Sequence, residues 1–486
     1  MNTRIIHKIK SGISGILISA LLTALPLCLP VFAGEKDPKA AQPEKQVSVK
    51  ITDDKKPAEA ISLYDLPTCL SIAEKNNIQL KLSDSRRKTA EADALQARIP
   101  LNVKMDFNAG YTYLNPTIQQ TFPAVPPAQP SVIDITTQDN YKANLTVTKT
   151  LTTFGRAENR IKAADLQSKA KVSDYEYSKS KIKFLVKQNY YYVLSQKGLA
   201  DTASENLTLT GEQYDVAKKL NKEGVLPGFD VRQANLKTMV ARQSFITQQN
   251  SYMKNTAAFL NLLGIDSARK DILLAPVSGI LEDMPFLKDE QALINTAFEN
   301  RDDIKSAVLL VESSRKHLAS ANASANPSVG LMAQYENHTK TAFSTQDQWT
   351  GMITLQIPVI DGGTKTAEVK KARENLFQAE QQLQQLKDDV KLDVIQSVLD
   401  YTDARCRYET SETEVTVAGE NYKIALERYK SGISTNVELD SALNDLNSAK
   451  VRKINSIYSL QTAIAKLEYA TGKDFNTGEK LCSNRQ

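Results

Sequence analysis

Histidine and cysteine are scarce in this chain. The 486 residues contain 3 histidines and 4 cysteines, and only His317 and His338 lie beyond residue 33. Both histidines stand alone in sequence, and the chain has no HExxH, P-loop, GxSxG or paired-cysteine motif. We therefore expect no catalytic residue, no cofactor and no metal site. The three cysteines after residue 33, which are Cys69, Cys406 and Cys482, form no disulfide framework, because their number is odd and their spacing is wide.

An excess of charge is also missing. The net charge is +5, and three of the positive charges fall within the first ten residues, which leaves +2 for the rest of the chain. No basic patch is interleaved with aromatic residues, so the sequence gives no reason to expect nucleic-acid binding.

Long apolar runs are absent beyond the N-terminus. Residues 1–33 have a basic start, an apolar stretch and Val31-Phe32-Ala33 before Gly34, a pattern typical of a cleaved secretory signal. An uncleaved anchor helix is the alternative. Lipidation of Cys28 stays undecided, because Leu27 is a poor match to the small residue that this signal prefers. No later run reaches the ~18 apolar residues of a membrane-spanning helix.

Helical periodicity dominates what is present. Residues 34–60 are charged and aperiodic, which predicts a flexible segment. Apolar residues then recur at helical spacing over 66–99, 155–221 and 229–262. The second helix would be about 100 Å long at ~1.5 Å per residue, and the other two about half of that. Two half-length helices placed end to end would therefore lie alongside one full-length helix.

Four stretches alternate with a period of two instead. They lie at about 101–114, 140–150, 327–338 and 348–359, and each predicts a strand with one apolar and one polar face. Between the first two, the stretch 115–139 contains five prolines, so we expect an exposed loop there.

The second half of the chain repeats the first. Gly363 follows Gly155 by 208 residues, and the same offset relates Gly224 to Gly432 and Gly264 to Gly472. The sequence thus predicts a duplicated helix–strand–strand–helix unit. The first repeat covers 61–272, a linker covers 273–285, the second repeat covers 286–473, and 474–486 form a tail.

Strands of about ten residues are long enough to cross a bilayer when tilted. The apolar side chains would then face lipid, namely Val103, Phe107, Leu145, Val147, Leu331, Ile353 and Leu355. Charged side chains on the other face would line a lumen, namely Lys104, Asp106, Lys142 and Glu336. Four strands cannot close a barrel, and open edges are forbidden in lipid, so several copies must close one barrel together. A soluble sheet with one wet face is the alternative.

Several motifs resemble those of the TolC outer-membrane efflux family. They are Leu355–Gly363 (LQIPVIDGG), Arg428–Ser434 (RYKSGIS), Tyr469–Gly472 (YATG), and the segment from Leu63-Tyr64-Asp65-Leu66 to Asn76-Asn77. The resemblance covers about residues 61–473. It implies a mostly α fold with transmembrane β structure: a homotrimer whose α-barrel is fused to a shared 12-stranded β-barrel, with four strands per chain.

The resemblance also implies a function. Such channels sit in the outer membrane of Gram-negative-type bacteria, with a large periplasmic part, and dock onto a periplasmic adaptor and an inner-membrane pump. The chain would then be the exit duct of a tripartite efflux or type I secretion system, and not an enzyme. The competing hypothesis is a periplasmic coiled-coil scaffold or adaptor without a pore.

Two groups of residues are candidates for the inner end of such a duct. The helix–helix turns would meet the adaptor through Gly224, Val225, Leu226, Gly432, Ile433 and Ser434. Asp230 and Glu438, which share the offset of 208, could form a carboxylate ring at the pore aperture. The family has a ring of acids near Glu438, with Asp440 one residue out of phase with its second position. Alternatively Thr435–Glu438 is a capping box, in which Glu438 bonds the backbone.

Overall fold

The computed structural model describes residues 62–267, 272–276, 289–339 and 347–475. All of them belong to one compact unit, Ala60–Gln486. The expected signal peptide with Cys28, the segment 34–60, residues 277–285 of the linker, and residues 476–486 of the tail with Cys482 lie outside the described residues.

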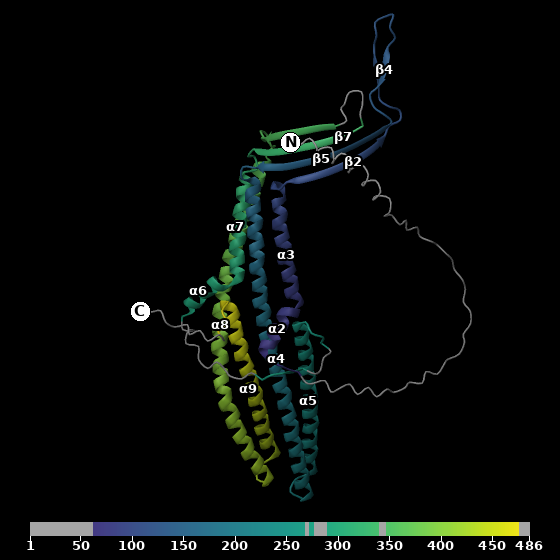
Figure 1. The fold of residues 1–486 in the computed structure, drawn as a ribbon. Coiled ribbons are helices and arrows are strands. Elements are labelled where there is room, and N and C mark those ends of the chain that lie inside the picture. The colour runs from purple at the N-terminus through teal and green to yellow at the C-terminus, as the bar shows by residue number, and fades with distance from the viewer. Residues whose placement is uncertain (1–61, 268–271, 277–288, 340–346, 476–486) are drawn as a thin grey trace, which may run out of the picture. The chain divides into compact units, whose positions relative to one another are not determined.

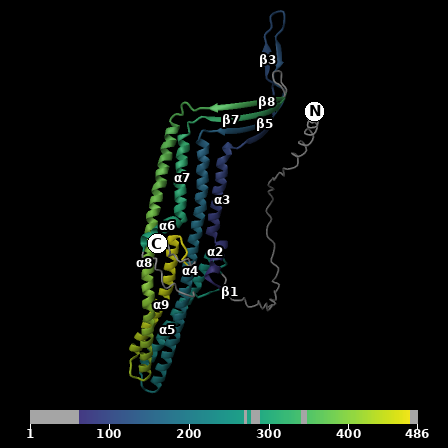
Figure 2. The same ribbon diagram turned by 60° about the vertical axis from the view of Figure 1, so that its left-hand side comes forward.

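Two helices of 67 residues run through the described unit, α4 (Arg156–Lys222) and α8 (Thr364–Lys430). Beside α4 lie α3 (Ile78–Arg98) and then α5 (Gly228–Leu263). Beside α8 lie α7 (Asp302–Asn322) and then α9 (Asn436–Thr471). In both views the shorter helices follow one another along the long ones (Figures 1 and 2). α7 and α9 also contact α4, which joins the two halves.

The helix expected over 66–99 is in fact two helices. α2 (Leu66–Asn76) ends where α3 begins, because the side chain of Asn77 accepts a hydrogen bond from the backbone N–H of Leu80 at 3.1 Å and so caps α3. Asn77 also donates to the carbonyl of Leu262 at 2.8 Å. The second repeat is broken at the equivalent point, between α6 (Glu290–Asn300) and α7, where Arg301 donates to the carbonyl of Ala470 at 3.4 Å.

These breaks fit against glycines at the ends of α5 and α9. Gly264 follows α5 with φ +72, and a Cβ added there would lie 2.6 Å from the carbonyl oxygen of Asn76. Gly472 follows α9 with φ +68, and its nearest neighbour would be the backbone N of Arg301 at 3.2 Å. Glycine therefore serves both the left-handed helix end and the close approach of two backbones.

The main hydrophobic core lies where α2, α4 and α5 meet a small parallel sheet. This sheet pairs β1 (Ser62–Tyr64) with β6 (Ile272–Leu274). Tyr190 is buried against Phe259 and Leu260, and its hydroxyl donates to the carbonyl of Ala275 at 2.7 Å. Burial raises the pKa of Tyr190, so its phenol remains a hydrogen-bond donor.

A four-stranded antiparallel sheet lies at the end of α3, α4, α7 and α8 that is away from the α4–α5 and α8–α9 turns (Figure 1). Its strands are β2 (Lys104–Tyr113), β5 (Asp139–Thr152), β7 (Ser328–His338) and β8 (Asp347–Gln356), in the order β2-β5-β7-β8. Because β2 and β8 are the outer strands, each has one edge that no described strand covers.

The expected loop at 115–139 is exposed, and it also contains two short strands. β3 (Gln119–Phe122) and β4 (Ser131–Asp134) pair as an antiparallel hairpin beyond β2 and β5. The prolines lie outside these four-residue strands, so none removes a ladder hydrogen bond.

Candidate pore and docking site

The strand register places the four expected lumen residues on one face of the sheet. Lys104 lies opposite Thr148, Asp106 opposite Thr146, and Lys142 opposite His338, all on even-numbered positions. Lys142 and Glu336 form an ion pair at 3.0 Å. The polar face is therefore charged. Near the end of the sheet that carries the β2–β5 connection, two of its charges, Lys142 and Glu336, pair with each other.

The other face of the sheet is apolar and exposed. Phe107 pairs with Leu145, and Leu331 lies between Lys149 and Ile353 across three strands. Val147 is half-buried, whereas most large apolar side chains on this face are exposed, and Trp349 reaches 78 % exposure beside Tyr335. Leu355 shares this face, and Val103 lies one residue before β2. An apolar surface of this kind is a contact surface and not an ordinary wet face.

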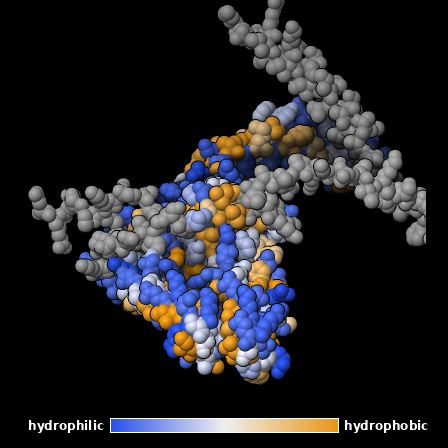
Figure 3. Space-filling view, turned by 90° about the horizontal axis from the view of Figure 1, so that it is seen from below, coloured by the Kyte–Doolittle hydropathy of each residue, from blue (hydrophilic) through white to orange (hydrophobic). Residues whose placement is uncertain are grey.

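The two helix–helix turns have glycines with positive φ, +79 at Gly224 and +70 at Gly432. Val225 is 55 % exposed and Ile433 is 73 % exposed. A Cβ at Gly432 would lie 3.7 Å from the side chain of Val225, so the two turns lie next to each other. Seen from this end, hydrophobic patches lie among hydrophilic side chains (Figure 3). Ser434 lies half-buried beside them.

Leu226, one of the turn residues expected to meet the adaptor, is less exposed than Val225 and Ile433. Leu226 is half-buried and packs against the cluster that contains Tyr422, Tyr429 and Leu439. Its carbonyl accepts a hydrogen bond from the side chain of Asn221 at 2.6 Å. The turn folds Leu226 back onto the helices, so its side chain stabilises the turn and leaves Val225 and Ile433 as the exposed pair.

The three acidic candidates differ in their contacts. Glu438 is exposed and accepts a hydrogen bond from the hydroxyl of Ser434. Its backbone N–H donates to the side chain of Thr435 at 3.3 Å, so one half of the expected capping box is present. Asp230 lies in the first turn of α5, half-buried. Asp440 forms an ion pair with Lys237, and its side chain is only 14 % exposed.

Sequence reasoning missed Lys237. It lies seven residues after Asp230, hence on the same face of α5. The spacing could be seen in the sequence. The ion pair between Lys237 and Asp440 of α9, however, depends on how α5 and α9 pack against α4. Burial lowers the pKa of Lys237 from its usual value.

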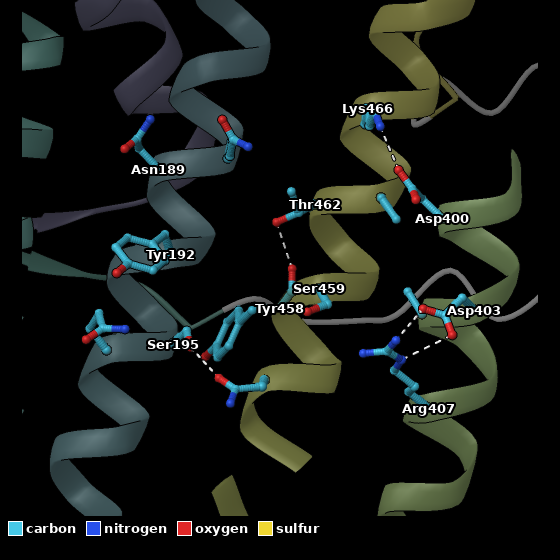
Figure 4. A pocket seen from close by; sticks show the side chains of 15 residues that line it. Asn189, Tyr192, Ser195, Asp400, Asp403, Arg407, Tyr458, Ser459, Thr462 and Lys466 are labelled. Atoms are coloured by element: carbon cyan, nitrogen blue, oxygen red, sulfur yellow. Dashed lines mark hydrogen bonds and ion pairs between the residues drawn. The ribbon is translucent and has the colours of Figure 1, made fainter. Parts of the chain in front are cut away.

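A polar groove between α4, α9 and α8 was also missed (Figure 4). Tyr192 and Ser195 line it from α4, on the side of that helix opposite Tyr190. Its charged side chains are paired, Lys466 with Asp400 at 2.6 Å and Arg407 with Asp403 at 2.9 Å. The groove thus offers hydrogen-bonding groups to solvent or solute.

Among the described residues, no three His, Cys, Asp or Glu side chains cluster so that they could hold a metal ion. No described helix is both long enough and apolar enough to span a membrane.

A sequence profile of the outer membrane efflux protein family matches residues 69–265 and 293–473, which together make up most of the chain. The chain belongs to the outer membrane efflux protein family. This family comprises channels and is not a family of enzymes. The two matched segments each contain two strands of the four-stranded sheet and one of the 67-residue helices.

Individual relatives are distant. The chain is 24 % identical over 293 residues to the probable efflux pump outer membrane protein TtgC of Pseudomonas putida, and 23 % identical over 289 residues to protein CyaE of Bordetella pertussis. Each match covers 58 % of this chain, and 58 % and 60 % of the relatives. The chain thus matches less than two thirds of the length of these curated relatives.

Solved structures extend the likeness in fold. The outer membrane channel CmeC of Campylobacter jejuni matches with a TM-score of 0.72 at 17 % identity, over 90 % of this chain and 94 % of CmeC. VceC of Vibrio cholerae matches with a TM-score of 0.71, over 84 % of this chain and 96 % of VceC. This chain, a helical bundle continued by a sheet, therefore has the fold of outer membrane channels.

Proposed function

We propose that this protein is the outer-membrane exit duct of a tripartite efflux or type I secretion system. The observation that carries this proposal is the four-stranded sheet, which has one exposed apolar face, one charged face and two open edges. In a bilayer the apolar face would contact acyl chains while the charged face lines water. Membership in the outer membrane efflux protein family supports this location.

From the open edges of β2 and β8 we infer that the protein forms a homotrimer. Each edge carries unpaired backbone N–H and C=O groups, which cannot remain unsatisfied within a bilayer. Pairing β8 of one copy with β2 of the next satisfies both edges, and three copies of four strands give a closed barrel of 12 strands. The same copies bring α8 of one protomer beside α3 and α5 of the next, which extends the barrel as a ring of helices.

The helix–helix turns are the part of the duct that we assign to partner proteins. They lie at the opposite end of α4 and α8 from the sheet, hence farthest from the membrane (Figure 2). The exposed pair Val225 and Ile433 beside two glycines suits contact with the helices of a periplasmic adaptor, which in turn links the duct to an inner-membrane pump. Substrates pass through without chemical change.

Asp230 and Glu438 are proposed to make the aperture cation-selective. In a trimer the two positions supply six carboxylates near the inner end, and a ring of carboxylates attracts cations and repels anions. The double variant D230A/E438A should lose cation selectivity, measured as the reversal potential across a salt gradient. The matched control is D165A/E380A, which removes two acids from the long helices. Equal reversal potentials for wild type and D230A/E438A would show that the acids serve only the helix ends.

The main test uses purified full-length protein in planar bilayers and in detergent. A duct gives stable conductance steps, and the detergent-solubilised protein has the mass of three protomers. A monomeric mass together with no conductance would contradict the proposal. A periplasmic scaffold without a pore would instead partition into the aqueous fraction without detergent.

A further inference from the structure

The junction between β5 and α4 contains a backbone conformation that is unfavourable for its residue. Phe154 has φ +48, and among the described residues no other residue besides glycine has positive φ. The equivalent position in the second repeat is Gly362, with φ +62. In each repeat the next residue is a glycine with positive φ, Gly155 after Phe154 and Gly363 after Gly362. Glycine would thus serve the same turn without the steric cost that a Cβ incurs there.

The turn itself makes no use of the phenyl ring. The backbone N–H of Phe154 donates to Thr152 at 3.1 Å, and its carbonyl accepts from the side chain of Asn326 at 2.7 Å. Any residue except proline could make these two bonds. The ring is 54 % exposed and belongs to none of the hydrophobic clusters of the described residues. More than half of the ring surface is therefore available for a contact outside the protomer.

A second copy of the chain is poorly placed to cover Phe154. The sheet edges open to pairing are those of β2 and β8, whereas β5 lies between β2 and β7 of its own protomer. Exposed apolar residues at the edge junctions, such as Val103 before β2 and Ile360 after β8, could be buried by a neighbour. Phe154 follows β5, an internal strand, and so lies away from both open edges.

The apolar face of the sheet continues toward this junction. Phe107, Leu145 and Leu331 lie on it, and Lys149 is an exposed lysine of the same face, paired in register with Leu331 and five residues before Phe154. A lysine at the end of an apolar strand face is typical of the headgroup level, where its amine reaches phosphate while its stem stays in contact with lipid. In transmembrane β-barrels, girdles of aromatic residues flank the apolar band at the same level.

We propose that Phe154 is a lipid anchor whose ring sits at the boundary between phospholipid acyl chains and headgroups, and so fixes the depth of the channel at the helical end of the sheet. This inference rests on the proposed membrane function. The unfavourable backbone of Phe154 is retained because the ring gains an apolar contact that glycine cannot make.

The test measures the depth of single tryptophans in the full-length protein. Trp349 is the only tryptophan of the chain, so W349F provides a silent background. The variants F154W, F107W and Y192W in this background are reconstituted into phosphatidylcholine vesicles brominated either near the carbonyl end or near the methyl end of the acyl chains. F154W should lose most fluorescence with the carbonyl-end lipid, and F107W should lose more with the methyl-end lipid than F154W does. Y192W, on α4, should lose none.

The outcomes separate the two proposals. Quenching of F107W without quenching of F154W overturns the anchor and leaves the duct intact. If neither is quenched, the proposed membrane function itself fails.

F154G offers a second measurement, because glycine suits this turn and the variant should fold. Combined with F107W and W349F, it removes the anchor and should shift the ratio of carbonyl-end to methyl-end quenching at position 107. An unchanged ratio would also overturn the anchor.

Discussion

Gly264 holds the junction of the first repeat in a way that can be tested by adding a single methyl group. In G264A, the new Cβ would lie 2.6 Å from the carbonyl oxygen and 2.8 Å from the carbonyl carbon of Asn76, both of them backbone atoms. The left-handed conformation at φ +72 costs a residue with a Cβ about 1–2 kcal/mol. Displacing a packed backbone adds about 1–3 kcal/mol. The junction should therefore be destabilised by roughly 2–5 kcal/mol.

Two other glycines provide matched controls. Gly472 has φ +68 with its nearest backbone atom at 3.2 Å, so G472A should cost less than G264A. Gly224 has φ +79 and no atom within 4 Å, so G224A should show only the conformational cost of about 1–2 kcal/mol. The order of destabilisation is then G264A, G472A, G224A.

Hydrogen exchange read out by mass spectrometry in detergent measures this effect locally. At roughly tenfold per 1.4 kcal/mol, amides at the α2–α3 junction and at the end of α5 should exchange about 30- to several-thousand-fold faster in G264A. Peptides around Arg301 and Gly472 should keep wild-type protection. Equal effects of G264A and G224A on their own segments would refute the role that we give to close backbone approach.

Three further predictions concern single side chains. N77A removes both the cap of α3 and the bond between helices, and should cost about 1–3 kcal/mol, measured as the urea midpoint in detergent. Burial opposes the charged form of Glu158, but hydrogen bonds from Thr153 and the Gly155 N–H outweigh it and lower its pKa from 4.5. Its stabilisation is thus present above that value and lost as pH falls through the lowered pKa, so E158Q should flatten the acid limb of the stability–pH curve. L226A should cost about 1–2 kcal/mol because Leu226 is partly buried, whereas V225A should stay within about 0.5 kcal/mol and weaken only adaptor capture.

The sheet was predictable because its pattern is local. A strand in contact with lipid on one face and water on the other must alternate at every residue, so residues such as Phe107 and Asn108 reveal the face without any tertiary information. Register then placed all four charged lumen candidates on one face. The long helices were equally visible, since a helical period sustained over more than sixty residues is typical of one continuous helix.

The breaks in the helices were not predictable in the same way. Asn77 interrupts an apolar periodicity that continues on both sides, and its reason for doing so is the carbonyl of Leu262, which lies 185 residues away. The packing of Leu226 could not be predicted for a related reason. Its neighbours at the turn are glycine and exposed valine, and only the packing of α8 and α9 against α4 provides the pocket that takes it.

The unusual backbone of Phe154 could have been predicted by comparing the two repeats of the sequence. The duplication aligns Phe154-Gly155 with Gly362-Gly363, and two glycines in the second repeat already indicate left-handed backbone at both positions. A phenylalanine at one of them is a local conflict, and natural sequences keep such conflicts mainly where a contact outside the local structure compensates. In a duplicated chain, the residue type at one position of a repeat thus indicates the backbone conformation needed at the equivalent position of the other repeat. The residues that depart from this requirement, such as Phe154 here, are the ones to test first for a contact with the environment of the protein.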